Sequence, residues 1–155
     1  MKTVDQWFAE YGASHQNPSN KRLHWICVPL IVVSLVGLLA SLPVPGVFAR
    51  ISPAFNWGTL LLLFGVIYYF VISWSLALGM LVFAAIVLAA LALLEMLPGA
   101  LWIACVALFV IAWIGQFIGH HYEGSRPSFF KDVQFLMIGP LWLLSFIYRK
   151  LRIPY

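Results

Sequence analysis

The chain has 155 residues, a length that suits one domain, which we take as residues 1–155. Apolar residues make up 63% of it and charged residues 9%, against roughly 25% charged in a typical soluble domain, so a soluble fold would lack its charged shell. The formal charge of +4 comes from scattered basic residues, most of them near the ends of apolar runs. This pattern suits anionic lipid headgroups and disfavours nucleic acid, which needs a clustered basic face.

The first predicted element is a short amphipathic helix near the N-terminus. Thr3 and Gln6 have the spacing of a capping box, and Gly12 is the expected helix end. The apolar residues of one helical face are Val4, Trp7, Phe8 and Tyr11. Such a helix either lies flat in the headgroup region or packs against the rest of a bundle, and the sequence leaves both open.

Four hydrophobic segments follow that are long enough to cross a bilayer, whose core of about 30 Å needs about 20 apolar residues. The predicted spans are residues 24–42, 58–74, 78–97 and 100–119. Prolines or glycines bound several of them, and tryptophans fall near their ends as in an interfacial aromatic belt. We therefore expect an all-α fold, a polytopic membrane helical bundle.

A fifth hydrophobic segment, residues 133–148, is shorter than the roughly 20 residues that a span needs. Pro140 also removes a helical hydrogen bond near its centre. If the segment does not cross, nearly all basic residues gather on the side that carries both termini, which the positive-inside rule assigns to the cytoplasm. We predict a short broken or interfacial helix, with a short span in a thinned bilayer as the alternative.

The four histidines of the chain give the strongest functional signal. His15 and His24 precede or begin the first span, whereas His120 and His121 end the fourth. Because an even number of crossings separates the two pairs, topology alone brings all four to one membrane face. Ionisable residues at membrane depth mark functional sites, and neutral imidazole suits iron, zinc and copper. We favour a metal site over interfacial histidines that bond to backbone or lipid.

Four more polar residues accompany the histidines. Asn20 lies between the first pair, and Gln116 stands one helical turn before His120 on the same face, so either could accept the second ring N–H of a ligating histidine. Glu123 and Arg126 follow the second pair. They suit a carboxylate near the metal and a guanidinium that binds an anionic substrate, or else a surface ion pair of little worth.

Two stretches of the sequence resemble a known family. The first is YGASHQNPSNKRLH over residues 11–24, followed by Val28-Pro29. The second is WIGQFIGH over residues 113–120, followed by Glu123, Arg126-Pro127 and Gly139-Pro140-Leu141. Together they resemble the small membrane family once filed as a domain of unknown function, DUF962.

The resemblance implies an Fe(II)-dependent dioxygenase of fatty acid α-oxidation, an oxidoreductase that uses dioxygen to convert a 2-hydroxy fatty acid into the acid one carbon shorter. His15, His24 and His120 fall on the family's motif, and His121 joins them as a candidate ligand through its position. The expected location is a bacterial inner membrane, or the endoplasmic reticulum in a eukaryote. Two alternatives stay open: a b-type haem electron carrier and a non-catalytic membrane protein with a zinc site.

The chemistry of the implied substrate agrees with this ligand set. A 2-hydroxy acid can chelate iron through its carboxylate and its hydroxyl, and an octahedral ion with three protein ligands keeps a further position for dioxygen. Four histidine ligands would leave two positions, so either the substrate binds through one oxygen or one histidine lies outside the ligand set. The acyl chain would lie among the spans. Because such a chain already partitions into lipid, its transfer to the protein yields little free energy, and we expect specificity at the polar end.

Overall fold

The computed structural model describes residues 2–124, 126 and 134–155, and within these ranges the chain forms helices and turns without a strand. The helices are α1 (Val4–Ala13), α2 (Pro18–Ala40), α3 (Gly46–Ile51), α4 (Trp57–Ile72), α5 (Trp74–Glu95), α6 (Leu101–Glu123) and α7 (Gln134–Leu151). Three of them, α2, α5 and α6, are long and apolar enough to cross a membrane, and α4 is a shorter apolar helix. The predicted all-α membrane bundle is confirmed.

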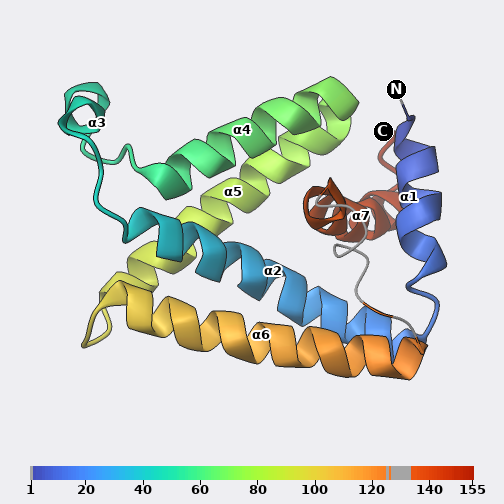
Figure 1. Cartoon of the computed structure of the whole chain (residues 1–155). Helices are drawn as coiled ribbons and strands as arrows, with labels where there is room; N and C mark the ends of the chain where they lie inside the picture. The colour runs from blue at the N-terminus through green and yellow to red at the C-terminus, as the bar shows by residue number, and fades with distance from the viewer. Residues whose placement is uncertain (1, 125, 127–133) are drawn as a thin grey trace.

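Two antiparallel pairs of helices form the body of the bundle (Figure 1). α2 and α6 lie side by side along their whole length, and α4 and α5 form a hairpin that crosses α2. At the end where α2 begins and α6 finishes, α7 lies between α1 and the α4–α5 hairpin. The four predicted spans thus correspond to α2, α4, α5 and α6, and the beginning of α2 meets the end of α6 as the topology requires.

Small residues allow α2 and α6 to approach closely. A Cβ on Gly115 of α6 would lie 2.5 Å from the Sγ of Cys27 on α2, and one on Gly37 of α2 would collide with Cys105 of α6. Glycine opposite a small side chain is a common way for membrane helices to gain van der Waals contact. Both cysteines are buried, and packing explains their positions.

The connection between α4 and α5 is tighter than predicted. Ser73 ends α4 and also caps α5, where its hydroxyl accepts the N–H of Leu76 at 3.3 Å. The predicted boundary placed the start of this span at residue 78, whereas α5 begins at Trp74. One serine is sufficient because its side chain replaces the carbonyl that the first turn of a helix lacks.

The N-terminal helix packs against the bundle. The predicted capping box is confirmed, since Thr3 and Gln6 bond each other's backbone N–H. The buried face of α1 lies on α7, where the ring of Trp7 meets Phe135 edge-on with centroids 6.0 Å apart. Burial of this aromatic face favours the packing alternative over a helix that lies flat among headgroups.

The fifth hydrophobic segment forms one continuous helix, so the predicted break is not present in the described residues 134–148. α7 continues through Pro140 and is buried along most of its length. Nearby protein supports it: the hydroxyl of Tyr69 on α4 donates to the carbonyl of Met137 at 2.8 Å, next to the carbonyl of Leu136 that Pro140 leaves without its helical N–H. A proline interrupts a helix less where neighbouring helices hold the freed backbone in place. Its interfacial position stays a prediction.

Candidate metal centre

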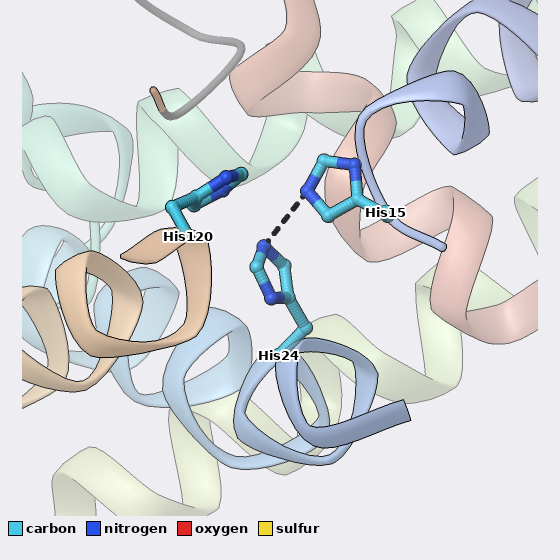
Figure 2. Close-up of side chains that lie close together, drawn as sticks. All are labelled: His15, His24 and His120. Atoms are coloured by element: carbon cyan, nitrogen blue, oxygen red, sulfur yellow. Dashed lines mark hydrogen bonds between the residues drawn. The ribbon is translucent and has the colours of Figure 1, made fainter. Parts of the chain in front are cut away.

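Three histidines from three different segments converge in the interior (Figure 2). His15 lies in the loop after α1, His24 in the second turn of α2, and His120 near the end of α6. Their candidate ligand atoms all lie within 4.8 Å of one another. The three side chains are between 1% and 2% exposed, which is rare for histidines without partners.

The hydrogen bonds of His15 and His24 indicate which ring nitrogens carry the protons. Each ring places its Nδ1 on a backbone carbonyl, at 2.6 Å from Tyr11 O for His15 and at 2.9 Å from Asn20 O for His24. A carbonyl oxygen only accepts, so both Nδ1 atoms carry the proton of a neutral ring. The two Nε2 atoms, 2.9 Å apart, then face each other with lone pairs. A cation between or beside them would relieve this contact.

The third ring supplies a further unsatisfied atom. The Nδ1 of His120 is buried and has no hydrogen-bond partner among the described residues. Nitrogen ligands about 2.1 Å from a metal stand about 3.0 Å apart at an octahedral right angle and about 3.4 Å apart at a tetrahedral angle. The 2.9 Å between His15 and His24 is closer to the octahedral spacing. These three residues therefore fit a metal ion.

Burial keeps the histidine of the loop in its ligating form. Desolvation lowers the pKa of His15 below its usual range, although its bond to the Tyr11 carbonyl acts in the opposite direction. The phenol ring of Tyr11 stacks on the imidazole with centroids 4.2 Å apart. Burial raises the pKa of this phenol, which stays protonated. The surroundings thus favour neutral imidazole, the form that binds metals.

Glu123 fastens the loop that carries His15. Its carboxylate accepts the backbone N–H of Gln16 at 2.7 Å, the backbone N–H of Asn17 at 2.9 Å and the amide of Asn20 at 2.9 Å. Asn17 in turn donates to the carbonyl of Tyr122 at 3.1 Å. The end of α6 therefore holds both the loop and the start of α2, so one carboxylate connects all three segments that bear the histidines.

A small cavity of about 40 Å³ adjoins the three histidines. Its other lining residues are Tyr11, Val28, Ile31, Val32, Trp113, Gln116, Phe135, Leu136 and Gly139. One wall belongs to α7, which sequence reasoning did not connect with the site. The sequence signal for this wall was the Gly139-Pro140-Leu141 element of the family resemblance. In the structure Gly139 packs closely against the site, because a Cβ on it would lie 3.0 Å from the hydroxyl of Tyr11.

The other predicted site residues divide into two groups. Asn20 is fully buried beside the histidines, and Gln116 lines the cavity. His121 points away from the three-histidine group and is exposed, as is Arg126, which lies next to residues outside the described ranges. Within the described ranges, the carboxylate of Glu123 accepts hydrogen bonds from the loop between α1 and α2, and not from the guanidinium of Arg126.

Comparison with known proteins gives two matches. The family model described as 2-hydroxy-palmitic acid dioxygenase Mpo1-like matches residues 1–151. The 2-hydroxy-palmitic acid dioxygenase MPO1 of Saccharomyces cerevisiae is 30% identical over 142 residues, which cover 90% of this chain and 76% of the yeast protein. No solved structure matches the chain.

Proposed function

Because this chain belongs to the Mpo1-like family, we propose that it is a membrane dioxygenase that converts a 2-hydroxy fatty acid into the fatty acid one carbon shorter. One 2-hydroxy acid and one dioxygen would give the shortened acid, carbon dioxide and water. This balance needs no external reductant, because the substrate supplies all four electrons that dioxygen accepts. The yeast relative's name specifies a 2-hydroxy acid, which points to the same substrate class here.

The observation that carries the proposal is the set of inward nitrogens on His15, His24 and His120. We assign these three side chains as the ligands of Fe(II). Held by these three side chains, the ion would keep free positions for the carboxylate and hydroxyl of a 2-hydroxy acid and for dioxygen. When bound, Fe(II) would supply Lewis acidity and the redox chemistry toward dioxygen.

The protein's own contribution is to orient the ligands and the substrate. Backbone carbonyls accept the ring N–H of His15 and of His24, which fixes both rings with Nε2 toward the centre. Gln116 is an uncharged polar side chain that lines the cavity together with His120. We propose that its amide donates to the carboxylate or hydroxyl of the substrate and so holds the carbon to be oxidised near the ligands.

The geometry disfavours the haem alternative. Axial ligands stand on opposite sides of a haem iron, whereas His15 and His24 touch through their Nε2 atoms at 2.9 Å. A cavity of about 40 Å³ also has no room for a porphyrin. A three-histidine set does suit zinc, so the metal is the variable that the experiment must test.

The decisive experiment measures metal content and turnover together. Metal-stripped protein, reloaded without oxygen and then given 2-hydroxypalmitic acid and air, should release the fifteen-carbon acid with Fe(II) and not with Zn²⁺. Replacing His15, His24 or His120 by alanine should remove iron and activity, while the His121→Ala control keeps its iron. Full activity of metal-stripped protein would overturn the proposal.

A further inference from the structure

A second cavity adjoins the one at the histidines. It lies between α2, α4, α5 and α7, measures about 90 Å³, and shares Ile31, Val32 and Leu136 with the histidine cavity. The two cavities therefore adjoin, with these three side chains between them.

The chemistry of the second cavity selects its occupant. Its lining is aliphatic, aromatic or thioether, and the hydroxyl of Tyr69 is already bonded to the carbonyl of Met137. A polar ligand would lose its hydrogen bonds to water here without replacement, which disfavours its binding. The cavity therefore suits a hydrocarbon chain.

The length of the space fits one acyl chain. Val36 lines the far end of the second cavity, and at 1.5 Å per residue it lies about 18 Å beyond His24 along α2. One leaflet of a bilayer, half of a core of about 30 Å, is about 15 Å deep. From the histidines to Val36 the protein thus offers about the depth that a long acyl chain occupies in its own leaflet.

A third space, beside His15, has the opposite character. It is lined by Asp5, Gln16, Lys21 and Arg149 among others, so it suits water and charged groups. This polar space touches His15 and shares no lining residue with the second cavity. A molecule with a polar head at the metal would extend its chain in one direction.

Building on the proposed function, we propose that the second cavity binds the acyl chain of the 2-hydroxy acid and that its walls set the chain length the enzyme accepts. Transfer of the chain from lipid yields little free energy, as the sequence already indicated. Steric exclusion needs no such gain, because a chain that is too long meets packed side chains, and overpacking is costly. The polar end would select the 2-hydroxy acid, and the cavity would select its length.

Two neighbouring alanines of α5 offer a matched test. Ala84 lines the second cavity one turn beyond Met80, whereas Ala85 is exposed on the outer surface of the same helix. Ala84→Leu should lower kcat/KM for 2-hydroxypalmitic acid by about tenfold or more, in the range that misfitting methylenes cause in apolar pockets. Turnover of 2-hydroxyhexanoic acid should stay near the wild-type value. Ala85→Leu should leave both substrates unchanged.

A binding experiment gives a readout that does not depend on turnover. 2-Hydroxypalmitic acid with a diazirine at its terminal carbon would be photolysed with iron-loaded protein in lipid nanodiscs without oxygen. We expect adducts near Val36 and Leu61, and excess unlabelled 2-hydroxypalmitic acid should suppress them. Adducts mainly at outward-facing positions such as Val82 and Ile86 would overturn the inference, even if the Ala84→Leu protein fails to fold.

The two hypotheses fail in different ways. If wild-type protein turns over no 2-hydroxy acid, the proposed function is wrong, and the adduct map still shows whether the cavity binds an acyl chain. If wild-type protein is active but Ala84→Leu treats both chain lengths as wild type does, the acyl-chain assignment alone is wrong. If Ala84→Leu loses activity equally on both substrates, the adduct map decides whether the second cavity binds the acyl chain.

Discussion

Glu123 offers the sharpest test of how the metal centre is held together. It makes no hydrogen bond to the three histidines, all of which the structure describes, yet its carboxylate accepts hydrogen bonds from the loop that carries His15 and from Asn20 on α2. Glu123→Ala removes all three bonds and adds no bulk. We therefore expect the loop to loosen and metal affinity to fall while the helices stay folded.

The structure allows the size of this effect to be worked out. A hydrogen bond to a charged group contributes about 1.5–3 kcal/mol when buried, but Glu123 is half-buried, so water replaces part of it and about 1 kcal/mol for each bond is reasonable. Losing the three bonds would cost about 2–3 kcal/mol, equivalent to roughly 30–150-fold in metal affinity. Glu123→Gln keeps one acceptor but turns an N–H₂ toward a backbone N–H, so we expect about tenfold.

The assay is competition between metal-stripped protein and a chelator for Co²⁺ or Fe²⁺, with thermal unfolding measured in parallel. Glu10→Ala is the matched control, because Glu10 makes an exposed ion pair with Lys2 on the surface of α1. Such pairs contribute about 0–1 kcal/mol, and this one lies away from the histidines. Wild-type affinity in Glu123→Ala would refute the assigned role, as would equal loss in the Glu10→Ala control.

Three further predictions follow from the same geometry. Gln116→Ala should reduce turnover by about 10–100-fold, measured at saturating iron, whereas unchanged kinetics would remove it from the site. Gly119→Ala should lower thermal stability by about 1–3 kcal/mol, since its Cβ would lie 2.5 Å from the Oδ1 of Asn20, while Gly46→Ala, with open space around it, should stay near wild type. Reporter fusions at the two termini should both report the cytoplasm, and opposite signals would show that α7 crosses the membrane.

Topology made the convergence of the histidines predictable. Hydropathy fixes the number of crossings between His24 and His120, and an even number returns the chain to the same face without any knowledge of packing. Helix geometry could also have separated His121 from His120, because neighbouring residues on an α-helix point about 100° apart. In the structure His120 faces the other histidines and His121 is exposed.

The partner of Glu123 was not predictable in the same way. Its nearest charged neighbour in sequence is Arg126, which suggested a local ion pair. The actual donors, the backbone N–H groups of Gln16 and Asn17, lie more than 100 positions earlier in the chain. Backbone donors leave no trace in side-chain chemistry, so only the folded arrangement of the loop against α6 reveals them.

Hydropathy also could not predict where α7 packs or which cavities it lines. The length of the segment and Pro140 indicated that it is unsuited to crossing lipid. They do not reveal that α1, α2 and α5 pack against it. A cavity is the space that side-chain volumes from several helices fail to fill, so it depends on packing rather than on any single segment. Here α7 contributes Leu136 to both cavities. A helix packed among other helices is thereby suited to close an internal site, because its buried faces meet side chains instead of lipid.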